Sequence, residues 1–94
     1  MAAKVVLDPY LKEDLLLRYP FYPIENLLKV IQRELARRYP KGSDAPSPPY
    51  AEGTKRIDIT ALTGGERYRV VPIYYYDSED AAVVIISVGI WPEP

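Results

Sequence analysis

Apolar and polar residues follow two different patterns along this chain, and each pattern predicts a different secondary structure. In residues 23–39 apolar side chains recur at i, i+3, i+4, i+7 and i+11, which is typical of an amphipathic helix. This predicted stripe consists of Ile24, Leu27, Leu28, Ile31 and Leu35. Segments 55–62, 66–76 and 82–91 are instead rich in Val, Ile and Tyr and are bounded by turn residues, which indicates β-strands. We expect the helix to lie on a sheet made of these strands.

Two shorter elements precede that helix. Residues 3–7 form a predicted first strand with β-branched valines. Asp8 and Pro9 then open a first helix, because Asp8 is a good N-cap and proline suits the first helical position. Pro20 and Pro23 end this helix, since proline cannot continue the hydrogen-bond ladder. The apolar side of the helix is expected to include Leu11 and Leu15, with one or more of Leu16, Leu17 and Tyr19.

The resulting order of elements is β-α-α-β-β-β. It predicts an α+β fold in which two helices pack on one face of a mainly antiparallel sheet. We expect residues 1–94 to form a single domain, because neither side of the proline-rich segment 40–53 is long enough to bury a core alone. Segment 40–53 is predicted to be a stiff loop, partly in polyproline II form, that connects helix to sheet. The alternative that residues 47–50 dock into a partner rests on too short a match to rank above chance.

Turn length predicts which side chains share a face of the sheet. A two-residue turn at 64–65 places Arg69 opposite Thr60 and Val70 opposite Ile59. Val70 then lies on the face that the helices cover, and Arg69 lies on the opposite, open face.

The second hairpin allows two registers. A five-residue loop over 77–81 places Gly89 opposite Arg69 and gathers the apolar residues on the covered face, namely Val84, Ile86, Val88 and Ile90 with Tyr74 and Tyr76. A four-residue loop spreads the apolar residues over both faces, so we expect the five-residue loop. Tyr75 alone of the three consecutive tyrosines then points outward.

The open face is the best candidate site in the sequence. It is expected to present Arg56, Asp58, Thr60, Arg67, Arg69, Tyr75 and Trp91, with Ser87 beside them. Arginine and aromatic side chains are enriched at binding hot spots. A cross-strand pairing of Arg with Asp and Thr is equally typical of an ordinary solvated sheet face.

Composition excludes several classes of function. Lys and Arg total 12 against 13 Asp and Glu, a net charge of -1, so we expect no DNA partner. Without histidine or cysteine, the chain has no disulfide, no thiolate nucleophile and none of the usual zinc sites. No metal and no cofactor is expected, because the acidic residues of 77–80 are routine turn formers. No apolar run approaches the ~18 residues of a membrane span, so we expect a soluble cytoplasmic protein with no membrane partner.

Asn, Gln and Met are nearly absent from the chain, and two origins fit this narrow alphabet. Thermophilic proteins tend to lack thermolabile residues, while engineered sequences show a similar choice of residues with strong local propensities. Composition leaves both origins open.

The order of elements, the Tyr-Arg-Val-Val stretch at 68–71 and the Val-Gly pair at 88–89 resemble the RelE/ParE toxin superfamily. The resemblance implies a toxin whose open sheet face cleaves messenger RNA on the ribosome, or targets gyrase in the ParE branch, and which an antitoxin peptide wraps. Arg69 matches the middle-strand arginine of that family. Lys55 and Arg56 match basic residues of its preceding strand.

Three hypotheses of function follow. The first is a non-catalytic interaction module with a protein partner, because residues 90–94 contain none of the basic residues, Tyr or His that follow Val-Gly in the nucleases. The alternative is a ribosome-dependent mRNA endonuclease of a type II toxin-antitoxin system, with Lys55, Arg56, Arg67 and Arg69 as phosphate contacts. The third is an engineered scaffold with no native partner.

Overall fold

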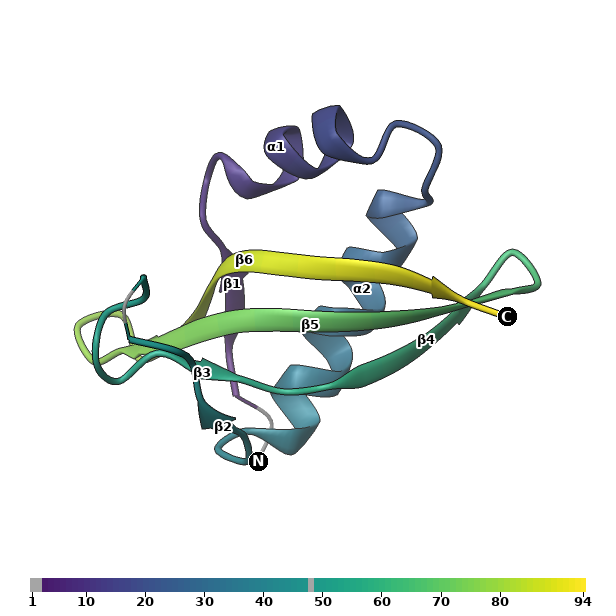
Figure 1. Ribbon diagram of the computed structural model, residues 1–94. Helices are drawn as coiled ribbons and strands as arrows, with labels where there is room; N and C mark the ends of the chain where they lie inside the picture. The colour runs from purple at the N-terminus through teal and green to yellow at the C-terminus, as the bar shows by residue number, and fades with distance from the viewer. Residues whose placement is uncertain (1–2, 48) are drawn as a thin grey trace.

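A six-stranded mixed sheet with a long helix on one face organises the structure, a computed structural model that describes residues 3–47 and 49–94 (Figure 1). Along the chain the elements are β1 (Val5–Leu7), α1 (Leu11–Arg18), α2 (Ile24–Arg38), β2 (Ser43–Asp44), β3 (Lys55–Arg56), β4 (Ile59–Thr63), β5 (Glu66–Asp77) and β6 (Ala82–Glu93). The sheet order is β1-β6-β5-β3-β2, and β4 also pairs with β5. β1 is parallel to β6 and the other pairs are antiparallel. The predicted α+β fold is confirmed.

Helix α2 carries the predicted apolar stripe. Its buried residues are Ile24, Leu27, Leu28, Ile31 and Leu35. They join the inward side chains of β4, β5 and β6 in one core, which includes Val70 at 0% exposure. α1 lies across the end of α2 and beside β6, and adds Leu11 and Leu15 to the same core (Figure 1).

Helix α1 begins two residues later than predicted. Asp8 caps a turn instead, because its carboxylate accepts the Tyr10 N–H at 3.1 Å and its carbonyl accepts the Leu11 N–H at 3.0 Å. Leu16 is 44% exposed and Leu17 is 81% exposed, so neither belongs to the buried side of the helix.

The predicted strand 55–62 is divided into β3 and β4, and Pro72 explains the division. Both strands keep one register against β5, which places Ile57 opposite Pro72. The residues that flank a two-residue turn form a hydrogen-bonded pair, and such pairs alternate along antiparallel strands. The Pro72 nitrogen therefore faces Ile57, where it has no N–H to donate, and the ladder is interrupted.

The first hairpin has the predicted register. Arg69 pairs with Thr60 and Val70 pairs with Ile59. Gly64 (φ 60°) and Gly65 both adopt positive φ, which the tight turn requires.

The second hairpin corrects the sequence-based register. Asp77 pairs with Ala82, so the loop has four residues, and a bulge at Ile73/Tyr74 then shifts the pairing by one residue. The extra residue is Ile86, which lies between the partners of Ile73 and Tyr74. The bulge keeps apolar residues inward on both sides of the shift.

Different side chains are buried as a result. The core takes Val83, Ile85, Val88 and Ile90, whereas Val84 and Ile86 are only half-buried. Gly89 lies opposite Val71, and Trp91 takes the place opposite Arg69. Tyr76 is 49% exposed rather than covered, and it stacks on Tyr39 with ring centroids 5.9 Å apart. Tyr74 is buried and Tyr75 points outward, as expected.

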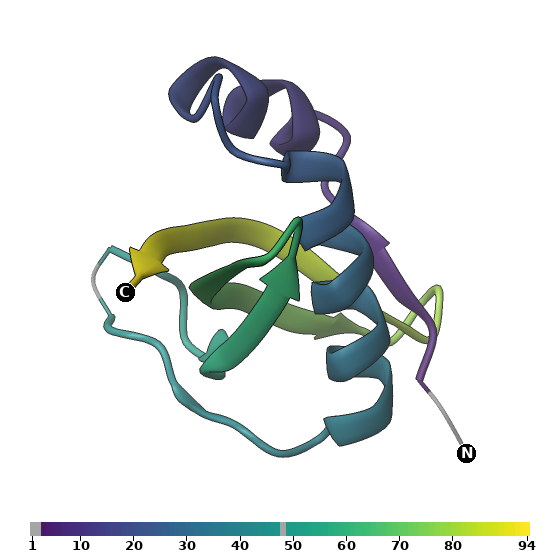
Figure 2. The same ribbon diagram turned by 90° about the vertical axis from the view of Figure 1, so that its right-hand side faces the viewer.

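The proline-rich connection does more than join helix to sheet. It passes from the end of α2 to the side of the sheet that α2 leaves open (Figure 2). There Ala45 and Tyr50 pack with Val71, Ile73 and Ile86 in a second, smaller apolar cluster. Part of the face expected to be open is therefore covered.

In the described part of the chain, no helix is both long and apolar enough to cross a membrane.

Candidate binding site on the open sheet face

The uncovered part of the sheet face carries nearly all of the predicted site residues. Those exposed are Arg56, Asp58, Thr60, Arg67, Arg69, Tyr75 and Trp91, while Lys55 is half-buried. Tyr75 does not belong with the rest, because it lies six residues from Arg69 on β5, about 20 Å along a strand. Val71 and Ile73, buried under the proline-rich loop, separate the two.

Arg69 is held by two neighbours. Its Nε and Nη2 donate to one carboxylate oxygen of Asp58 at 3.1 and 2.9 Å. Its guanidinium also lies over the Trp91 ring, 5.1 Å from the ring centroid. The positive charge of Arg69 is thus already compensated within the chain.

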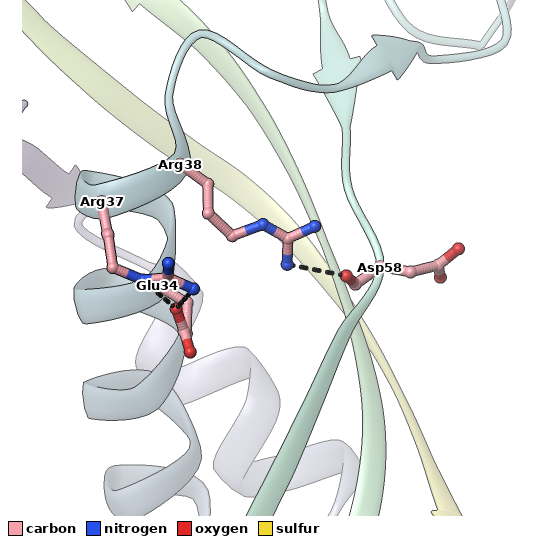
Figure 3. A network of polar contacts seen from close by, with 4 residues as sticks. All are labelled: Glu34, Arg37, Arg38 and Asp58. Atoms are coloured by element: carbon pink, nitrogen blue, oxygen red, sulfur yellow. Dashed lines mark hydrogen bonds and ion pairs between the residues drawn. The ribbon is translucent and has the colours of Figure 1, made fainter.

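Asp58 is placed for this contact by the end of α2. The Arg38 guanidinium donates to the backbone carbonyl of Asp58 at 3.1 Å, while the Asp58 carboxylate points away from it (Figure 3). Arg37 instead pairs with Glu34 on the helix itself, with Nη2 2.6 Å from the carboxylate (Figure 3). That hydrogen bond lowers the pKa of Glu34 below its usual value.

Gly89 makes room for the Trp91 ring. A Cβ at Gly89 would lie 2.6 Å from Cη2 of Trp91 and 2.9 Å from Cζ3, so any side chain there would displace the ring. The indole lies over Gly89 of its own strand, and Trp91 is 49% exposed. The absence of a side chain at Gly89 thus determines where the indole lies.

A groove of about 390 Å³ lies next to the indole. Val71, Ile73 and Gly89 contribute to its floor, and aromatic side chains from three segments line it, namely Tyr19 after α1, Tyr50 of the proline-rich loop and Trp91 of β6. Pockets of a few hundred Å³ with apolar walls and a few polar groups are typical ligand sites.

The charged residues that line the groove are both basic. Arg18 also pairs with Asp14 through Nη2 at 2.9 Å and lies over the Tyr19 ring. Arg56 forms no ion pair with any residue that the structure describes. It lies between this groove and a smaller polar hollow of about 160 Å³ that Asp58 and Arg69 line. An anionic group is the ligand that this uncompensated charge favours.

The other predicted cations are engaged or distant. Lys55 pairs with Asp44 of β2, and this hydrogen bond lowers the pKa of Asp44. Arg67 lies opposite Glu93 at the far end of β5, away from the groove.

Sequence reasoning missed the groove residues that come from outside the predicted strands, namely Arg18, Tyr19, Pro46 and Tyr50, and did not assign Val71, Ile73 or Val88 to the site. The one sequence feature that pointed toward any of them was the proximity of Tyr50 to the prolines of its loop. A single aromatic residue in a loop belongs to no repeating pattern, so it does not indicate which face it will contact. Among residues 3–47 and 49–94, no group of three or more acidic residues is arranged to hold a metal ion.

Comparison of the chain with protein-family models, with curated proteins and with solved structures gave no match.

Proposed function

We propose that this chain is a non-catalytic interaction module that binds a protein partner in the groove between Trp91 and Tyr50. The observation that carries the proposal is the pairing of an aromatic, apolar groove with the uncompensated charge of Arg56 at its edge. A half-exposed tryptophan beside an arginine has the composition of a binding hot spot.

The chemistry of the groove selects its ligand. Its apolar floor and aromatic walls favour a large apolar or aromatic side chain, which gains by leaving water. Arg56 favours a carboxylate next to it, because an arginine-carboxylate contact is charge-assisted. We therefore infer a peptide segment with Asp or Glu adjacent to an apolar anchor.

The endonuclease alternative has less support. It needs Arg69 as a phosphate contact, yet Asp58 and Trp91 already hold that guanidinium. A phosphate would have to share the guanidinium with the Asp58 carboxylate, and Lys55 is likewise paired with Asp44. The RelE/ParE resemblance stays a prediction about the scaffold, and under it the bound segment would be an antitoxin-like peptide.

A peptide library displayed on phage and selected on the immobilised chain tests the proposal. We expect enriched peptides to share an acidic residue beside an aromatic or large apolar one. Their binding should quench or shift the emission of Trp91, the one tryptophan of the chain.

The variants Arg56→Gln and Trp91→Ala should lose binding, whereas Arg33→Gln, the same change at an exposed arginine of α2, should keep it. Selected peptides that bind all three variants equally would show that the groove is not the site. Induced expression in bacteria tests the alternative, because growth arrest with cleavage of messenger RNA at the ribosomal A site would replace a binding role by a catalytic one.

A further inference from the structure

Strand β4 (Ile59–Thr63) is an edge strand. It pairs with β5 on one side, and no strand in the described part of the chain pairs with the other. β3, which pairs with β5 on the same side as β4, is instead paired on its other side with β2. The edge at β1 is covered by α2, where Ala3 N–H donates to Ala36 carbonyl at 3.1 Å and Gln32 donates to Val5 carbonyl at 3.4 Å.

The turn at 64–65 determines which backbone groups of β4 point outward. Thr63 and Glu66 flank that turn and form a hydrogen-bonded pair, so every second residue back along β4 also points its N–H and carbonyl toward β5. Thr60 and Leu62 lie between these inward-pointing residues and direct their own N–H and carbonyl groups outward, away from β5. Asp58 continues this alternation, and its carbonyl does point outward, since Arg38 of α2 contacts it.

The outward backbone groups of Thr60 and Leu62 have no hydrogen-bond partner among the described residues. The segment Ile59–Thr63 also has no charge, no proline and no bulge, which are the features that protect exposed edges. Leu62 adds a side chain that is 70% exposed. An edge of this kind is a template for a further strand.

We propose that β4 pairs antiparallel with β4 of a second copy of this chain, around a two-fold axis at Ala61. In this register Thr60 lies opposite the partner's Leu62, and Leu62 lies opposite the partner's Thr60. Both members of each pair direct their backbone groups toward the other, so the two pairs form the hydrogen bonds that the free chain lacks.

The side chains fit the same register. Leu62 and the partner's Leu62 are diagonal neighbours on the open face, within reach of each other. Beyond the central pairs Asp58 lies opposite the partner's Gly64, so like charges do not face each other. The interface is the same surface on both copies, as a two-fold dimer requires. It is independent of the groove, which lies over β5 and β6.

Sedimentation equilibrium over a range of micromolar concentrations tests the dimer. We expect a monomer-dimer equilibrium that Leu62→Lys weakens at least about tenfold, because it places a charge on the edge. Thr60→Pro should act similarly, since it removes an outward N–H and leaves the pairing with β5 intact. Leu17→Lys is the matched control, the same change at another exposed leucine, on α1, and should leave the equilibrium unchanged.

Hydrogen exchange gives a second readout that does not depend on the variants. The amides of Thr60 and Leu62 should exchange slowly at concentrations where the dimer forms and fast in the monomer, while Ala61 is protected in both. A chain that stays monomeric throughout, or a dimer that Leu62→Lys leaves intact, overturns the proposal.

Discussion

Replacing Gly89 by alanine perturbs the site at its tightest contact. The new Cβ would lie 2.6 Å from Cη2 of Trp91, about 1 Å inside the ordinary carbon-carbon separation of about 3.5–4.0 Å. The β6 backbone is held by its ladder to β5, so the indole must move. We expect it to tilt away from Gly89 into solvent and to leave the guanidinium of Arg69.

The free energy of unfolding should change little, because two effects of similar size oppose each other. Loss of the contact between Arg69 and Trp91 costs about 0.5–1 kcal/mol at an exposed site. Removal of a glycine from a strand interior stabilises by about 0.5–1 kcal/mol, and Gly89 is not among the residues with positive φ, so alanine meets no backbone strain there. The net change should stay within about 1 kcal/mol.

Fluorescence of the single tryptophan is therefore the sensitive assay. In Gly89→Ala the emission should shift to longer wavelength, and acrylamide should quench it more strongly. Ser87→Ala, two residues earlier on the same face, should leave both unchanged. Emission and quenching in Gly89→Ala equal to those of the native chain would refute the placement of the indole over Gly89.

Three further predictions concern the sheet. Arg69→Ala should lower the free energy of unfolding by about 0.5–1.5 kcal/mol, because both contacts of Arg69 are exposed. Val70→Ala should lower it by about 1–3 kcal/mol, because Val70 is buried. Chemical denaturation measures both variants, and a larger loss for Arg69→Ala would mean that the covered and open faces of the sheet are assigned the wrong way round. Burial, and secondarily the nearby Tyr39, raises the pKa of Tyr74 above its usual value, so its stabilising contribution is complete below pH about 10 and is lost at higher pH. Tyr74→Phe should be less stable than the native chain at neutral pH, because it loses the hydrogen bond to the Lys41 carbonyl. Its free energy of unfolding should fall less than that of the native chain as the pH rises above about 10. An equal fall in both would contradict this. Pro72→Val should gain a slowly exchanging amide at position 72, and fast exchange there would exclude the missing donor as the cause of the gap between β3 and β4.

The elements that sequence predicts well depend on local chemistry. The stripe of α2 needs only a helical period and one apolar face to cover, and all five of its predicted members are buried. The register around Arg69 follows from the two glycines at 64–65, because such a short turn leaves no freedom in the pairing. Local rules therefore determine both the helix and the first hairpin.

The predicted register of the second hairpin was wrong for a non-local reason. A four-residue loop next to Asp77 would expose apolar side chains if the register continued unchanged. The bulge at Ile86 restores the inward side chains, but nothing in residues 77–81 indicates a bulge further along β6. Pro72 does indicate an interruption of the ladder, though not on which neighbouring strand.

The candidate groove exists because of these two corrections together. The structure places Trp91 opposite Arg69, whereas the expected register placed Gly89 there and Trp91 opposite Arg67, at the end of β5 that lies away from the groove. The proline-rich loop then covers Val71 and Ile73 and supplies Tyr50 as the opposite wall. Residue types on one sheet face were predictable from alternation alone, but a concave site also needs a wall from outside the sheet. Its position depends on tertiary packing that no repeating pattern in the sequence encodes.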